Sequence, residues 1–318
     1  MEIFIPVLLM FLGFLILIKS SDVFVDAISS IAVNFRMSKM MIALTVAAFG
    51  TCAPELAISF NSISSQQGEI ALSNVIGSNV VNILLIIGLA AFICPIRVKN
   101  VVTKKELPIL VGITSTFTIC TTIHYLKANY NFILNRFDAV LFIIYFIIFI
   151  SYIISVIRSK QGVFERSSAK YKLLTSIILS IVCCALIIVA SDLVVDNAVK
   201  LASVFNVSQK LITMTIVVIG TSLPELTMTV VAAKKGEFDI ALGNIIGTNI
   251  FNIGIVLGVP LLIYGGFGTN SFYLIDILAV EVAVVVLYLF AKNDKVLSRL
   301  EGSIMIGLFL MYYVYLFF

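Results

Sequence analysis

The sequence predicts an all-α polytopic membrane protein with ten transmembrane helices, arranged as two inverted five-helix repeats with broken helices at the bilayer midplane. Three observations support this fold class: the composition, the spacing of long apolar segments, and an internal repeat without gaps. The 318 residues are 61% hydrophobic and 12% charged, with a mean hydropathy of +1.15. Water-soluble chains of this length are far more polar, so most of this chain must face lipid or other apolar helices.

Ten apolar segments are long enough to cross the hydrocarbon core, which takes about 20 helical residues. The expected spans are 3–19, 38–64, 69–94, 106–126, 136–157, 172–190, 208–233, 239–264, 271–291 and 301–318. The first and sixth spans are expected to continue as helix into the amphipathic stretches near 20–35 and 190–205. The first span has no basic residue before it and no small-residue cleavage site after it, so we interpret it as a helix of the protein and not as a signal peptide.

The two halves of the chain repeat one another. Residues 21–89 align with residues 191–259 without a gap, and 24 of the 69 positions are identical. The repeated motifs are GTCAPEL (Gly50–Leu56) and SNVIGSNVVN (Ser73–Asn82) in the first copy, and GTSLPEL (Gly220–Leu226) and GNIIGTNIFN (Gly243–Asn252) in the second. Because each half holds five spans, an odd number, the second half must enter the membrane upside down. Transporters built this way place their substrate where the halves meet.

This repeat also predicts the domain organisation. We expect a first inverted repeat over residues 1–157 with its motifs at 50–82. A cytoplasmic linker is expected over 158–171, and a second repeat over 172–318 with motifs at 220–252.

The distribution of basic residues predicts the orientation. The loops after spans 1, 3, 5, 7 and 9 carry 17 of the 21 Lys and Arg residues. The positive-inside rule then places these loops in the cytoplasm and both termini outside, as expected of a multi-pass plasma-membrane protein. Short basic loops between apolar spans argue against a nucleic-acid surface. The sequence gives no sign of an obligate protein partner, and the lipid bilayer is its expected environment.

Each repeat breaks a helix and places an acid at the break. Pro54 has no N–H, so the carbonyl of Gly50 loses its helical partner. Glu55 adds a charge beside this free carbonyl, and Thr51 adds a hydroxyl. The second repeat has the same arrangement, with residues Gly220, Thr221, Ser222, Pro224 and Glu225. An acid within a membrane is costly, and by default it marks a site for ions or protons.

A second helix in each repeat supplies a polar face. The residues at positions i, i+4 and i+8 of these faces are Asn74, Ser78 and Asn82 in one copy and Asn244, Thr248 and Asn252 in the other. Gly77 and Gly247 are expected to let helices approach closely, and Asn79 and Asn249 to hydrogen-bond to a neighbouring backbone. Oxygen atoms predominate, which favours Na⁺ or Ca²⁺ over zinc, copper or haem. A kinked structural helix would explain one copy of the motif but not two in register.

These motifs resemble those of the sodium/calcium exchanger family, within the calcium/cation antiporter superfamily, and the short central linker is similar to the prokaryotic members. The resemblance extends over the whole chain. It implies a transporter and not an enzyme, with no prosthetic group and with Ca²⁺ and Na⁺ as transported ions. In such a transporter, one pocket binds either Ca²⁺ or several Na⁺ and faces the two sides of the membrane alternately.

The resemblance also implies the roles of individual residues. Glu55 and Glu225 would be the central Ca²⁺ ligands, completed by the backbone carbonyls of Thr51 and Thr221. One flanking Na⁺ site would use Ser78, Ser222 and Thr221. The other would use Thr248, Thr51 and Cys52. Backbone carbonyls near Ala48 and Val218 would contribute, and Asn82 and Asn252 would line the middle of the pocket.

The chain departs from the family pattern at two positions. Cys52 stands where a small hydroxyl residue is common, and a thiol is a poor Na⁺ ligand. Asn252 stands where the potassium-dependent branch has Asp, which argues against K⁺ transport. The pocket then carries a charge of about −2 from its two glutamates, so exchange of one Ca²⁺ for more than two Na⁺ would be electrogenic.

Three other functions stay open at this point. The same fold could exchange Ca²⁺ for H⁺, although the proton branch usually has a G-N-x-x-E motif. The chain could also be an intramembrane acid protease or a passive channel. Outside the motifs, we expect Asp22, Asp26, Asp192 and Asp196 to be interfacial, capping or paired with Lys, with a vestibule role left open. For Glu281 we expect a buried structural pair or a protonated acid, with a functional role left open.

Overall fold

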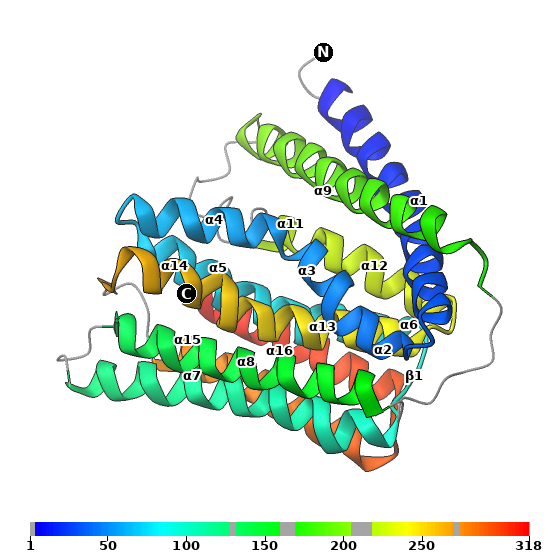
Figure 1. Ribbon diagram of the computed structural model, residues 1–318. Helices are drawn as coiled ribbons and strands as arrows, with labels where there is room; N and C mark the ends of the chain where they lie inside the picture. Colours follow the sequence, from blue (N-terminus) through cyan, green and yellow to red (C-terminus); the bar gives the residue numbers. More distant parts are fainter. Residues whose placement is uncertain (1–3, 128–131, 160–168, 205–217, 270–273, 318) are drawn as a thin grey trace.

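The computed structural model describes residues 4–127, 132–159, 169–204, 218–269 and 274–317. These residues are almost entirely helical, apart from two small sheets (Figure 1). Most of the predicted linker at 158–171 lies outside the described residues, and so does the beginning of the span predicted at 208–233.

Seven helices in the described part of the chain are long and apolar enough to cross a membrane. They are Phe4–Asn34 (α1), Gly68–Ile93 (α5, η2 and α6), Val102–Lys127 (η3 and α7), Arg136–Arg158 (within α8, Arg136–Ser159), Leu173–Leu201 (within α9, Leu173–Val204), Phe238–Tyr264 (α13, η5 and α14) and Leu274–Asn293 (α15). An eighth candidate is the pair Lys39–Thr51 and Ala53–Ser64, which bends by 49°. Ten spans therefore remain a prediction. The last two lie over α11 (Val218–Thr221) with α12 (Leu223–Lys234), and over α16 (Arg299–Phe317).

The two longest helices, α1 and α9, pack against each other on one side of the molecule (Figure 1). This confirms that the first and sixth spans continue into the amphipathic stretches that follow them. Gly13 permits the close approach, because a Cβ atom at this position would lie 2.6 Å from Cγ2 of Val194. A helix of 31 residues is about 46 Å long and exceeds the hydrocarbon thickness, so α1 must tilt or project beyond it.

The central helices are interrupted by wider π-helical turns. The helices are α2 (Lys39–Ile42), α3 (Ala48–Thr51), α4 (Ala53–Ser64), α5 (Gly68–Val80) and α6 (Gly88–Ile93) in the first repeat, and α13 (Phe238–Phe251) and α14 (Gly258–Tyr264) in the second. The π-helical turns among them are η1 (Ala43–Ala47), η2 (Val81–Ile87) and η5 (Asn252–Leu257). The turns η2 and η5 occupy matching places in the two repeats. Such turns are frequent at functional sites.

Each polar helix packs on the broken helix of the other repeat. A Cβ atom on Gly247 would lie 2.7 Å from Cβ of Ala48, and one on Gly77 would lie 2.7 Å from Cγ1 of Val218. Gly247 lies 170 residues after Gly77, and Val218 lies 170 residues after Ala48, so the two contacts correspond. The predicted close approach at both glycines is confirmed.

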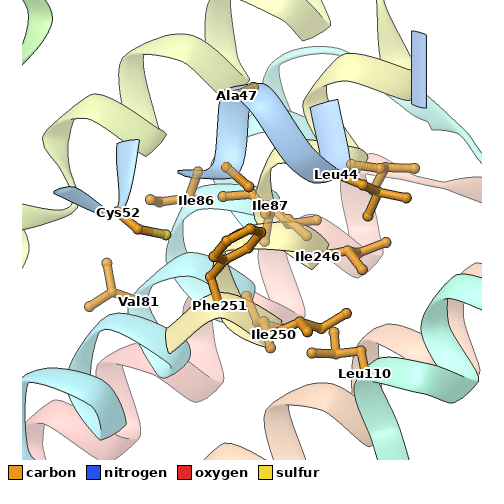
Figure 2. Close-up of a cluster of buried hydrophobic side chains, with 14 of the residues drawn as sticks. Leu44, Ala47, Cys52, Val81, Ile86, Ile87, Leu110, Ile246, Ile250 and Phe251 are labelled. Atoms are coloured by element: carbon orange, nitrogen blue, oxygen red, sulfur yellow. The ribbon is translucent and has the colours of Figure 1, made fainter. Parts of the chain in front are cut away.

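An apolar cluster fills the space around this crossing (Figure 2). Leu44 comes from the first broken helix, Ile246 and Phe251 come from α13, and Leu110 comes from α7 (Leu107–Lys127). These side chains join elements of both repeats into one core.

Two short antiparallel sheets join loops that are distant in the sequence. The strand β1 (Ile96–Arg97) pairs with β4 (Val296–Leu297), and β2 (Phe132–Leu134) pairs with β3 (Phe267–Thr269).

Ion pairs connect the basic loops. Lys39 contacts Glu237 at 2.7 Å, and Lys99 contacts Asp239 at 2.8 Å.

The acids near the end of α1 also pair with lysines, as predicted. Asp26 contacts Lys170 and Lys235 at 2.6 Å each, and Asp22 contacts Lys235 at 2.9 Å. The hydrogen bond from Lys170 to Asp26 raises the pKa of the Lys170 amine, in the segment before α9.

Candidate ion-binding site

Both proline-broken helices begin again with a buried glutamate in the first turn. Cys52 separates α3 from α4 with a backbone of φ −74° and ψ −2°, and Ser222 separates α11 from α12 with φ −89° and ψ 6°. Glu55 is 1% exposed and Glu225 is fully buried. Helix N-termini favour negative charge, so each break places a carboxylate where the backbone dipoles stabilise it.

The carbonyl freed by the second proline has a partner from outside its helix. Ser191 of α9 donates a hydrogen bond of 2.9 Å to the carbonyl of Gly220. The matching residue in α1, Ser21, donates instead to the hydroxyl of Thr227 at 3.0 Å. Both matched serines therefore bond to the second half, although the two halves share a sequence pattern.

Around these glutamates lies a group of buried oxygen atoms without hydrogen-bond partners among the described residues. They are both carboxylate oxygens of Glu55 and Glu225, the hydroxyl oxygens of Ser78, Ser222 and Thr248, and the amide oxygens of Asn82 and Asn252. We call these seven residues the oxygen cluster. Each is at most 1% exposed. Buried polar atoms are nearly always paired, so a group of unpaired oxygens fits a hard cation.

The members of the oxygen cluster come from both repeats, and the elements that carry them pack against one another across the repeats. The helix of Glu55, α4, packs on η5, which carries Asn252, and the helix of Glu225, α12, packs on η2, which carries Asn82. Both carboxyl groups are buried in the first turn of their helices. Two like charges in an apolar interior repel strongly, and a divalent cation would relieve this repulsion.

Crossed asparagine pairs link the two polar helices. The amide nitrogen of Asn82 donates to Oδ1 of Asn249 at 3.4 Å, and that of Asn252 donates to Oδ1 of Asn79 at 3.2 Å. The prediction that Asn79 and Asn249 bond to a neighbouring backbone is therefore wrong. The two helices present their amides to each other at matching levels, so side chain meets side chain. The remaining oxygens of Asn82 and Asn252 stay unpaired.

The threonines at the breaks bond to the preceding turn. The hydroxyl of Thr51 lies 3.3 Å from the carbonyl oxygens of Ala47 and Ala48 and 3.4 Å from Oδ1 of Asn244, three acceptors that share its single hydrogen. The hydroxyl of Thr221, which is half-buried, donates to the carbonyl of Val218 at 3.1 Å. Each break therefore gathers a hydroxyl and a carbonyl oxygen at the positions expected from the sequence.

Cys52 lies beside the second polar helix. Its sulfur is 3.9 Å from the carbonyl oxygen of Thr248, and the residue is 2% exposed. Figure 2 shows Cys52 in the apolar cluster with Val81 and Phe251. The structure thus brings Cys52 and Thr248 together, as expected. The contact is between the Cys52 thiol and the backbone carbonyl of Thr248, and not with the Thr248 hydroxyl.

Two buried hydroxyls were missing from the predicted site. Ser59 and Thr229 each lie one turn after the glutamate of their repeat, and both are fully buried. The Ser59 hydroxyl has no partner in the described chain, and that of Thr229 accepts a hydrogen bond from Asn244 at 3.4 Å. The signal was present in the sequence, because both positions carry a hydroxyl at the 170-residue offset.

Comparison with known proteins decides the family. A family model described as sodium/calcium exchanger protein matches residues 5–155 and 175–318. The chain belongs to the sodium/calcium exchanger family. This exchanger is 35% identical to the putative antiporter CaxA of Alkalimonas amylolytica, over 96% of each chain. It is 30% identical to the sodium/calcium exchanger MaX1 of Methanosarcina acetivorans, over 98% of each chain.

Solved structures agree with this membership. The sodium–calcium exchanger NCX_Mj, from crystals soaked with Na⁺ and Ca²⁺, matches with a TM-score of 0.82 and 30% identity over 98% of both chains. The chain thus has the helical membrane-transporter fold of this family, and it is a cation/Ca²⁺ antiporter by family and by fold. The family is one of transporters and not a class of enzymes.

Proposed function

We propose that this exchanger transports Ca²⁺ in exchange for Na⁺ by alternating access, electrogenically and without K⁺. The observation that carries the proposal is the oxygen cluster. Its two carboxylates neutralise one Ca²⁺, and its neutral oxygens offer the hard ligands that both ions prefer. One pair of carboxylates cannot serve both loads, so Ca²⁺ and Na⁺ compete. Without an ion, two bare carboxylates in an apolar interior oppose the change of side, and this enforces exchange.

Glu55 and Glu225 are proposed as the Ca²⁺ ligands, with backbone carbonyls of Thr51 and Thr221. The proposed Na⁺ ligands are Ser78, Ser222 and Thr221 on one side and Thr248, Thr51 and Cys52 on the other, with carbonyls near Ala48 and Val218. Independence from K⁺ follows from Asn252. The amide nitrogen of Asn252 donates a hydrogen bond to Oδ1 of Asn79, so the side chain offers the pocket a neutral oxygen and no third negative charge.

The same proposal includes ten spans in two inverted repeats, residues 1–157 and 172–318, joined by a cytoplasmic linker. Two observations support it. The sheet of β1 and β4 joins the loops after spans 3 and 9, and that of β2 and β3 joins the loops after spans 4 and 8. In a chain that crosses the membrane ten times, odd-numbered loops lie on one side and even-numbered loops on the other. Each sheet thus joins two loops that lie on the same side. The ion pairs of Lys39 and Lys99 connect only odd-numbered loops, which we place in the cytoplasm with both termini outside.

The proposal is tested by Ca²⁺ flux into proteoliposomes that contain the purified exchanger. A Na⁺ gradient directed outward is imposed first, then a pH gradient, each with and without K⁺. The expected result is uptake driven by internal Na⁺ and unchanged by K⁺. The uptake should also respond to membrane potential, because more than two Na⁺ would replace each Ca²⁺.

Each of the other outcomes would indicate a different transport mechanism. Uptake driven only by the pH gradient would make this a proton-coupled antiporter, with both glutamates as proton carriers. A requirement for K⁺ would overturn the role given to Asn252. Flux without any counter-ion gradient would identify a channel.

A further inference from the structure

A cleft of about 500 Å³ lies between α1 and α12, apart from the oxygen cluster. Its walls are formed by Ile18, Leu226, Val230 and Val231, with the methyl-bearing Thr227 between them. The remaining lining residues are Lys19, Asp22, Lys234 and Lys235. The cleft is therefore apolar along its length and basic at one end.

The basic end has two amines that the protein does not neutralise. Lys235 is paired with Asp22 and Asp26, at 2.9 and 2.6 Å. Lys19 and Lys234 are exposed, and neither has a hydrogen-bond or ion-pair partner within the described ranges. After pairing, the mouth of the cleft keeps two positive charges.

The position of Lys19 within the membrane means that an anionic partner would stabilise its charge. Lys19 lies within α1, one turn before Asp22, whose carbonyl accepts a hydrogen bond of 2.6 Å from Lys235 at the end of α12. Lys19 therefore lies about one helical turn, roughly 5 Å, deeper in the membrane than Asp22, and the lining on α12 continues back to Leu226, about 13 Å from Lys235. A lysine at this depth is costly unless its amine reaches the interface or finds a counter-charge.

We propose that this cleft binds an anionic phospholipid. The phosphate group bridges the amines of Lys19 and Lys234, and an acyl chain lies against Ile18, Leu226 and Val230. Charge complementarity selects the headgroup, because a zwitterionic lipid brings its own ammonium to a mouth that already has two. The apolar walls select an amphiphile and exclude a free anion. The cleft lies on the basic end of the molecule, which faces the leaflet where anionic lipids are concentrated in the proposed orientation.

The chain has no tryptophan, so one introduced tryptophan can report on the cleft alone. Ile18→Trp places the reporter in the cleft at a side chain that is 51% exposed. Ile148→Trp places a matched control on α8, at a side chain that is 52% exposed. Both full-length variants are reconstituted with phosphatidylglycerol or phosphatidylcholine that carries bromine on its acyl chains, which quenches nearby tryptophan fluorescence.

The expected result is that phosphatidylglycerol quenches the Ile18→Trp reporter at a mole fraction roughly 30-fold lower than phosphatidylcholine, since each of the two lysines adds about 1 kcal/mol. Ile148→Trp should show no preference. The added pair K19Q and K234Q should abolish the preference, whereas K19R and K234R should keep it. Neutralising Lys104 and Lys292, two exposed lysines outside the cleft, should leave it unchanged.

Equal quenching of Ile18→Trp by both lipids would overturn the proposal and leave only bulk lipid contact. A preference that survives K19Q and K234Q would also overturn it, because another feature would then select the lipid. The arginine pair separates loss of charge from misfolding. None of these readouts uses transport, so they stand whether or not the exchange proposed above is correct.

Discussion

At the scale of single residues, the unusual feature is a set of buried oxygens that the protein leaves unpaired. Each unsatisfied polar group costs about 1–3 kcal/mol, and a charged group costs more. A stable fold tolerates seven such residues in one place only if another species supplies the missing partners. We therefore expect the stability of the protein to depend on the concentration of the ions proposed to bind the oxygen cluster.

The glutamates should control Ca²⁺ binding. We expect Glu55→Gln with Glu225→Gln to reduce Na⁺-driven Ca²⁺ uptake to the level of empty vesicles, because the pocket loses both of its charges. Thermal unfolding gives a second readout: Ca²⁺ at 100 times its dissociation constant should stabilise the native protein by about 2.7 kcal/mol and the variant not at all.

Glu281 provides the control for this prediction. It also lies in a predicted span, but it accepts a hydrogen bond of 2.7 Å from Ser115, in line with a structural role. Glu281→Gln should keep both Ca²⁺ uptake and stabilisation by Ca²⁺. Uptake that persists in the double glutamate variant would remove these residues from the site.

Cys52 should set the affinity for Na⁺. Replacing its sulfur by a hydroxyl gives the pocket a hard ligand next to Thr248, so Cys52→Ser should lower the Na⁺ concentration for half-maximal exchange severalfold. Ca²⁺ affinity should change little, since the carboxylates are intact. The control is Cys183→Ser, at a buried thiol of α9. An unchanged Na⁺ dependence in Cys52→Ser would show that no Na⁺ contacts this position.

At the scale of elements, two glycine contacts hold the repeats together. Gly247 faces both Cβ of Ala48 and the carbonyl oxygen of Leu44, each at 2.7 Å from where a Cβ atom would be. The backbone of the neighbouring helix cannot move away from an added methyl group as a flexible side chain could. The distance between the two repeats is therefore fixed at this point by the absence of a methyl group.

Gly247→Ala should destabilise the protein by about 1–3 kcal/mol, because the added methyl group overpacks a helix crossing. Thermal unfolding in detergent measures the change. Gly307 is the matched control, since it lies in α16 with no atom within 4 Å of the added methyl group. Gly307→Ala should be neutral or stabilising by up to about 1 kcal/mol. Equal effects at both positions would mean that the crossing is not tightly packed.

Local features of these elements could be predicted from the sequence. The bend at Cys52 follows from Pro54, and the close helix approach follows from Gly77 and Gly247. The partners of Asn79 and Asn249 could not be predicted, because the register between two helices depends on the packing of the whole core. For the same reason, the repeat placed Ser191 in α9 but could not indicate that it caps Gly220.

At the scale of the whole molecule, the internal repeat and the basic loops carried most of the prediction. They indicated a helical membrane transporter, and the resemblance of the motifs within the repeat indicated its family. The repeat could not indicate that the matched serines of α1 and α9 both bond to the second half. Residues that the repeat matches would be expected to have the same surroundings, whereas the matched Ser21 and Ser191 have different hydrogen-bond partners.

The proposed orientation can be tested by labelling in a background without the five cysteines. Gln66→Cys, in the loop after α4, should react with a membrane-impermeant thiol reagent added outside intact cells. Lys295→Cys, in the loop before β4, should react only after the cells are opened. Both residues are exposed turn positions with positive φ, so reagent access is comparable. The reverse pattern would place both termini in the cytoplasm.

The crossed asparagines have a consequence for direction. Exchanging the two repeats turns the bond between Asn82 and Asn249 into that between Asn252 and Asn79. In the proposed inverted arrangement, the middle of the pocket would offer an ion the same amides from either compartment. We therefore expect the centre to favour neither direction, so that the net flow reverses when the two ion gradients reverse.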